Sequence, residues 1–126
     1  MIERWQDVAL CKGQEEIFFA GEKGSINYIE AGKYCSLCQV SAYCRASSLF
    51  ETHGFWAGVP STERALVRSE MNYELERDAH LVPEMARAAD RAYEAGEDPE
   101  PRLAEVIGED NARHLMALRG QELKIA

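Results

Sequence analysis

The sequence lacks any apolar run long enough to cross a membrane, and it has too little positive charge to attract nucleic acid over its whole surface. A transmembrane helix needs about 18 to 20 consecutive apolar residues, and no such run occurs. The 126 residues carry 14 Lys and Arg against 22 Asp and Glu, a net charge of −8. Contact with nucleic acid would therefore require a local basic patch or a protein partner.

The sequence also lacks an export signal, because its first 16 residues have no long apolar core behind a basic flank. We therefore expect a cytoplasmic protein without membrane contact, in a compartment where structural disulfides are rare. The length fits one domain, or one small domain with an appendage. A domain of this size buries only about two thirds of the surface of its unfolded chain, so a metal group could help to hold its core.

No segment shows the strict alternation of apolar and polar residues that is typical of a strand, so the predicted class is all-α. The composition changes near residue 60, since all four cysteines and nine of the eleven aromatic residues precede it. The second half is acidic and rich in alanine. We expect a cysteine-bearing domain over residues 1–77 and an acidic helical extension over residues 78–126.

Capping and breaking residues predict where several helices begin and end. Ser61 or Thr62 is suited to cap a helix. Pro83 suits the first turn of a further helix, which Gly96 would stop. Residues 96–101 should form a stiff, polar linker, and a last helical pair should be broken near Gly108.

The four cysteines are spaced Cys11-x23-Cys35-x2-Cys38-x5-Cys44. A CxxC pair with two further cysteines is typical of a zinc site or an iron–sulfur cluster, and the spacing does not decide between them. Structural zinc sites often join two CxxC pairs, so this pattern slightly favours a cluster. Buried cysteines without a ligand are a further alternative. A thioredoxin-like use of Cys35 and Cys38 would need a βαβ context, which is absent.

Gly54 and Gly58 flank an aromatic pair in the segment "GFWAG". Glycine on both sides predicts a tight turn that presents Trp56. Taken alone, the turn favours Trp56 as part of a small core.

Several motifs follow one another in a distinctive order. They are Trp5-x3-Ala9-x-Cys11, "IFF" at 17–19, the CxxC-x5-C pattern at 35–44, the glycine-flanked Trp56 turn, and "STERAL" at 61–66. In this order they resemble the WhiB-like family of actinobacterial and actinophage transcription regulators, over about residues 5–68. The chain departs from the family pattern at Phe55, where Val or Ile is usual, and at Ala57, where Gly is usual.

The resemblance implies a small helical domain organised around a [4Fe–4S] cluster, ligated by the four cysteines and sensitive to oxygen and nitric oxide. It implies a transcription regulator that is not an enzyme. Its partner would be region 4 of the principal sigma factor within the RNA polymerase holoenzyme. The positions that match the family's sigma-binding residues are Trp5, Phe18, Phe19 and Trp56. Large aromatic side chains often dominate the energy of an interface, which agrees with this role.

The segment after the turn departs from relatives that bind DNA, because it has no basic tail. Arg64 and Arg68 lie one helical turn apart and could share a phosphate contact, although pairing with neighbouring acids is the favoured interpretation. Direct DNA contact is therefore in doubt, and we expect residues 78–126 to cap the core or to bind another protein. The alternative functions are a zinc-stabilised adaptor and a thiol–disulfide reductase using Cys35 and Cys38.

Overall fold

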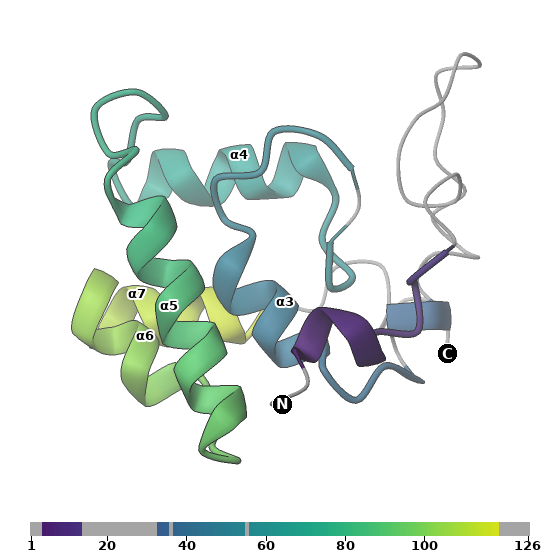
Figure 1. The fold of residues 1–126 in the computed structure, drawn as a ribbon. Coiled ribbons are helices and arrows are strands. Elements are labelled where there is room, and N and C mark those ends of the chain that lie inside the picture. The colour runs from purple at the N-terminus through teal and green to yellow at the C-terminus, as the bar shows by residue number, and fades with distance from the viewer. Residues whose placement is uncertain (1–3, 14–32, 36, 55, 119–126) are drawn as a thin grey trace, which may run out of the picture.

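The computed structural model describes residues 4–13, 33–35, 37–54 and 56–118, and within these ranges the protein is built from helices (Figure 1). The elements are the 3₁₀ helix η1 (Trp5–Val8) and the α-helices α3 (Ser41–Ser47), α4 (Ser61–Glu70), α5 (Leu81–Glu94), α6 (Glu100–Ile107) and α7 (Glu109–Met116). Residues 33–35 and 37 are also helical. The only β pairing in the described ranges is an isolated bridge between Trp56 and Val59. The all-α prediction is confirmed.

Helix α4 begins at Ser61 without the side-chain cap that the sequence predicts. Pro60 occupies the N-cap position in an extended conformation, and no side chain there accepts a hydrogen bond from the first turn. The capping prediction for Ser61 or Thr62 is therefore wrong. Both hydroxyl residues come too late, because the helix has already started at Ser61.

Helix α5 is an amphipathic helix whose buried face is lined mostly by small side chains. Its buried residues recur at helical spacing and are Leu81, Met85, Ala88, Ala89 and Ala92. The alanines let a neighbouring helix approach closely, and α3 packs along this face. Pro83 lies in the first turn, as predicted. The helix ends at Glu94, and Gly96 follows with φ of 69°, so the predicted stop is confirmed.

Helices α6 and α7 form the last helical pair. Gly108, with φ of 91°, ends α6 and begins α7, as the sequence predicts. The predicted linker over 96–101 is too long, because α6 already begins at Glu100. Pro101 stands in its first turn, where the missing N–H costs no helical hydrogen bond.

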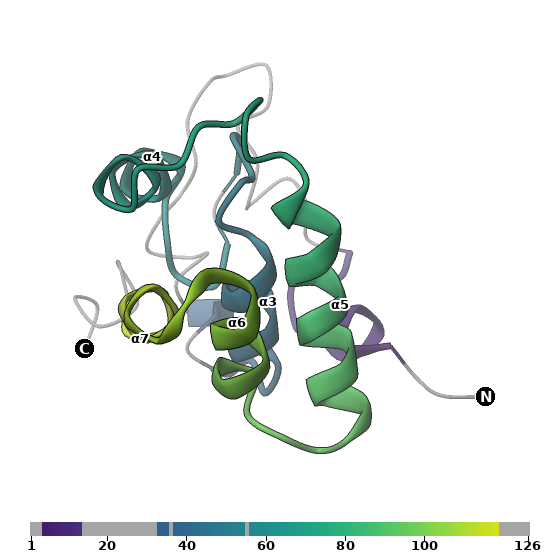
Figure 2. The ribbon, with the colours of Figure 1, turned by 90° about the vertical axis from the view of Figure 1, so that its left-hand side faces the viewer.

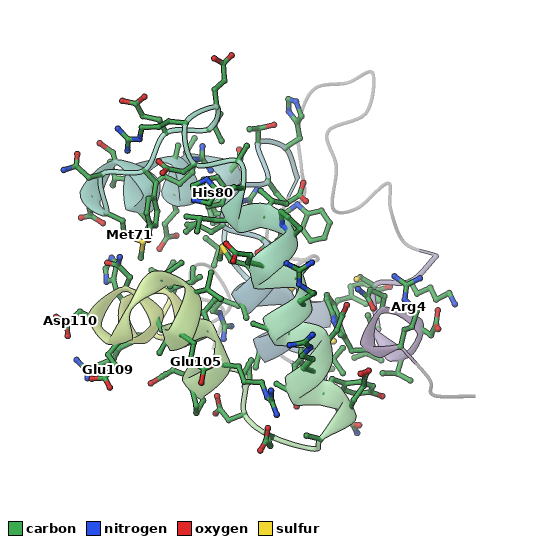
Figure 3. All side chains as sticks on the ribbon, turned by 60° about the vertical axis from the view of Figure 1, so that its left-hand side comes forward. Arg4, Met71, His80, Glu105, Glu109 and Asp110 are labelled. Atoms are coloured by element: carbon green, nitrogen blue, oxygen red, sulfur yellow. The ribbon has the colours of Figure 1, made fainter. Side chains whose placement is uncertain are left out.

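One hydrophobic core joins the two halves of the sequence. Its buried members are Ala46, Leu49, Val67, Leu81, Met85, Ala89, Leu103, Ile107, Ala112 and Leu115. Helix α3 packs against α5 and α7, and α5 also packs against α6 (Figure 2). Met71 points from the end of α4 toward α7 (Figure 3). Packing is thus continuous across residue 77, and the described helices after it, α5 to α7, pack on this core as a helical cap.

None of the helices in the described ranges is both long and apolar enough to span a bilayer.

The shared core predicts that damage to the cap destabilises the whole protein. Leu103 on α6 is fully buried, so Leu103→Ala should lower the free energy of unfolding by about 2–5 kcal/mol. Denaturant unfolding should report one transition for both halves, followed by the fluorescence of Trp5 and Trp56 and by helical circular dichroism. Leu66→Ala is the control, because Leu66 on α4 is 63% exposed and its loss should cost less than about 0.5 kcal/mol. Two separate transitions would contradict the shared core.

Candidate metal centre

All four cysteines line one cavity of about 310 Å³. Cys11 follows η1, Cys35 and Cys38 lie in the segment before α3, and Cys44 lies within α3. Trp5 lines the same cavity. The fold therefore brings Cys11 to the same cavity as the three cysteines that follow it at a distance in the sequence.

Backbone hydrogen bonds set the spacing of the three later cysteines. The N–H of Cys38 donates to the carbonyl of Cys35 at 3.3 Å, and the N–H of Ser41 donates to that of Cys38 at 3.4 Å. The N–H of Cys44 then donates to the carbonyl of Val40 at 3.2 Å in the first turn of α3. Successive turns thus present three thiols on the same side of the segment.

The electrostatic environment of Cys44 is that of a thiol among other thiols. Burial raises its pKa far above the ordinary value, and the negative charges of Cys35, Cys11 and Cys38 raise it further. The positive charge of Arg45 acts in the opposite direction. Four thiolates would repel one another here, and a positively charged metal group would offset that repulsion. The donor set therefore fits a metal–thiolate centre.

A single ion and a cluster require different spacings of their four thiolates. Among the described residues, no three or more His, Cys, Asp or Glu side chains are grouped so as to hold a single metal ion. Four thiolates around one zinc, with Zn–S of about 2.3 Å, would place the sulfurs only about 3.8 Å apart. A cubane cluster needs wider spacing, because each cysteine binds a different iron.

The turn that carries Trp56 is a two-residue hairpin turn. Ala57 and Gly58 are its central residues, with φ of 51° and 82°. Trp56 and Val59 exchange backbone hydrogen bonds of 3.1 and 2.8 Å. Two positive φ values in such a loop define a type I′ turn. Gly54, with φ of 83°, bends the chain just before it.

Ala57 adopts a conformation that usually favours glycine, at a cost of about 1–2 kcal/mol. Its side chain is 3% exposed, and its carbonyl accepts a hydrogen bond from Arg45 at 3.1 Å. Packing and this buried hydrogen bond hold Ala57 in the left-handed region. The departure from glycine at this position therefore leaves the tight turn intact.

Trp56 itself is only partly buried and lines the cysteine cavity. Its indole N–H donates to the carbonyl of His53 at 2.8 Å, which fixes the ring relative to the turn. Trp56 is therefore a wall of the cavity that keeps some exposed surface.

The structure corrects the sequence interpretation of Arg64 and Arg68. Their exposed fractions are 1% and 8%, so a shared phosphate contact is excluded in this fold. Their described acceptors are backbone carbonyls rather than neighbouring acids. Arg64 donates to the carbonyls of Glu51, His53, Gly54 and Val59 at 2.6–3.0 Å, and Arg68 donates to that of Leu49 at 2.8 Å. Burial lowers the pKa of Arg68, although arginine remains charged at neutral pH.

Of the remaining predicted aromatic residues, one is buried and two lie outside the described ranges. Trp5 is 6% exposed, and its indole N–H donates to Oδ1 of Asp90 on α5 at 3.0 Å. Phe18 and Phe19 lie outside the described residues. Asp90 was not predicted from the sequence, because it lies 85 residues from its partner and outside every motif.

Comparison with known proteins gives a family match over the first half of the chain. The model of the family described as transcription factor WhiB matches residues 5–67, which is half of the sequence. The match includes all four cysteines, Trp5 and the Trp56 turn, and it ends before α5. No curated protein and no solved structure matches the chain significantly.

Arg64 is predicted to be essential for the Trp56 turn. Arg64→Met keeps the length of the side chain but leaves four carbonyls without this donor, so unfolding should become easier by about 3 kcal/mol or more. The stability of Arg64→Lys should lie between those of the unaltered protein and Arg64→Met, because an ammonium group cannot reproduce the planar fork of the guanidinium group. Denaturant unfolding and the emission of Trp56 would measure these effects.

The matched control is Arg113→Met on α7. The Arg113 side chain is 67% exposed and pairs only with exposed Asp110 among the described contacts. Its loss should change the stability by less than about 0.5 kcal/mol. A similar small effect for Arg64→Met would show that its carbonyl contacts do not hold the turn.

Proposed function

The chain belongs to the WhiB family of transcription factors, and we propose that it acts as an iron–sulfur regulator that binds region 4 of the principal sigma factor. One observation carries this proposal. The four cysteines and Trp56 line the same cavity, so a metal group and a partner-binding aromatic side chain would share one platform. Binding of the partner would then depend on the state of the metal group.

The proposed cofactor is a [4Fe–4S] cluster held by Cys11, Cys35, Cys38 and Cys44. When bound, the cluster would supply a link among four thiolates that oxygen or nitric oxide can break. The cysteine pattern has one CxxC pair rather than two, which favours a cluster over zinc. The family description favours neither the adaptor nor the reductase alternative. Cys35 is only 7% exposed, so one thiol of the CxxC pair is shielded from a disulfide substrate, which opposes the reductase alternative.

The proposed partner-binding surface centres on Trp56. A large, partly exposed aromatic side chain, fixed by a hydrogen bond of its N–H, is a suitable interface anchor. Phe18 and Phe19 complete the proposed surface. Trp5 is too buried to offer a broad contact, and we assign it to the wall of the cavity that supports this surface.

Contact with the promoter would be made mainly by the partner. Arg64 and Arg68 are engaged inside the protein, and the chain has a net charge of −8. Glu105, Glu109 and Asp110 are exposed and point away from the core on the α6–α7 pair (Figure 3). Such a surface repels the phosphate backbone, which opposes the use of α6 and α7 as a DNA-reading pair.

The cofactor can be tested by anaerobic purification. We expect a brown protein with about four irons per chain and a broad visible absorption band, because four cysteines are available as ligands. Cys44→Ser should lose most of the iron. A colourless preparation containing about one zinc per chain would contradict the cluster.

The partner can be tested by anaerobic co-expression with sigma region 4. Trp56→Ala should abolish co-purification while the iron content stays unchanged, because the anchor is lost and the ligands remain. Trp56→Phe keeps an aromatic ring and should retain part of the binding. Leu66→Ala is the control, since Leu66 is exposed but does not line the cavity. Undiminished binding by Trp56→Ala would refute the assignment.

A further inference from the structure

The N-terminal segment that carries Trp5 and Cys11 is fastened to α5, a helix that lies beyond the family match. The indole N–H of Trp5 donates to Oδ1 of Asp90 at 3.0 Å, and the ring is 6% exposed. The contact joins residues 85 positions apart. In the view of Figure 2, α5 stands between α6 and the purple segment that begins with η1.

The opposite wall of the cavity is fastened to the same helix. Helix α3, which carries Cys44, packs along α5. Tyr43 of α3 meets Tyr93 of α5 edge to face, with ring centroids 5.4 Å apart. Its hydroxyl also donates to the carbonyl of Glu97, just after α5, at 2.7 Å. Both walls of the cavity therefore rest on one element outside the cysteine region.

We propose that α5 is an internal brace for the cysteine cavity, and that Asp90 positions Trp5 within it. Cys11 is on the wall fastened through Trp5, and Cys44 is on the wall fastened through α3. The brace holds these two walls together by protein contacts alone. A metal group would then enter a cavity that is already formed, rather than assemble the cavity from separate segments.

The chemistry of the Trp5–Asp90 contact suits this role. A hydrogen bond from a neutral N–H to a carboxylate is stronger than one between two neutral groups. Asp90 is exposed, but burial of the Trp5 ring limits competition from water at the donor. The tryptophan ring adds a large apolar area to the same contact. One side chain of α5 thereby fixes the position of the whole η1 segment.

The brace changes what loss of the metal would do. Without the brace, Cys11 would separate from the other cysteines once the metal leaves. With the brace, Trp5 stays docked, and the metal-free chain keeps this wall of the cavity in place. This inference concerns the protein's own contacts and does not depend on the identity of the metal or of the partner.

The test uses the reduced, metal-free full-length chain with Trp56→Phe, so that Trp5 is its one remaining tryptophan. Acrylamide quenching reports how often Trp5 leaves its site. We expect slow quenching in this parent chain. Asp90→Leu, which removes the acceptor, should raise the undocked population about tenfold or more. Asp90→Asn keeps an acceptor oxygen and should stay nearer to the parent than to the leucine variant.

The matched control is Glu84→Leu, which changes an exposed acid on the same helix. It should leave the quenching of Trp5 unchanged. Helical circular dichroism should be alike for Asp90→Leu and Glu84→Leu, which separates undocking of Trp5 from general damage to α5.

Three results would overturn the brace. The first is quenching of Trp5 in the parent chain that is as fast as in the same chain unfolded in urea. This result needs no variant at position 90. The second is unchanged quenching in Asp90→Leu, and the third is equal quenching in Asp90→Asn and Asp90→Leu. A colourless zinc protein, or one that does not bind sigma region 4, would instead count against the proposed function and leave the brace standing.

Discussion

The guanidinium group of Arg64 joins α4 to the loop that precedes it, and the Trp56 turn depends on this junction. The group is 1% exposed and donates to four backbone carbonyls between Glu51 and Val59. Two of these carbonyls, those of His53 and Val59, also accept hydrogen bonds from Trp56, so Arg64 holds the same atoms that fix the turn. The planar fork of arginine meets several acceptors at once, which lysine cannot do. The position of Trp56 beside the cysteines follows from this arrangement.

Features governed by local chemistry were predictable from the sequence. Glycine permits positive φ, so Gly96 and Gly108 were correctly expected to end helices. The lack of strand periodicity correctly indicated an all-α fold. The cysteine pattern predicted one shared site, and the four cysteines do line one cavity, although the spacing could not separate one ion from a larger cluster. That distinction depends on the distances between thiols, which sequence spacing does not encode.

Features governed by long-range contacts were not predictable. Arg64 was expected to pair with neighbouring acids or with phosphate, yet its described acceptors are backbone carbonyls, which every residue has and no motif marks. Asp90 is one of many acids in the second half of the chain, and nothing nearby distinguishes it. The start of α4 was misjudged for a different reason, because Pro60 already occupies the N-cap position. Each error arose where tertiary contacts, or an overlooked neighbour, outweighed a local preference.

Burial of arginine also changes the charge that the protein presents to its surroundings. Arg45, Arg64 and Arg68 all lie inside, at 3%, 1% and 8% exposure. Taking these three positive charges from the net charge of −8 leaves −11 on the rest of the chain. The long-range field still reflects the net charge of −8, because a buried charge keeps its field outside the protein. The charged groups that a polyanion could contact directly are nevertheless more acidic than the composition indicates. Added salt would screen the repulsion between this acidic surface and a polyanion, whereas it would weaken the attraction of a basic protein to the same polyanion.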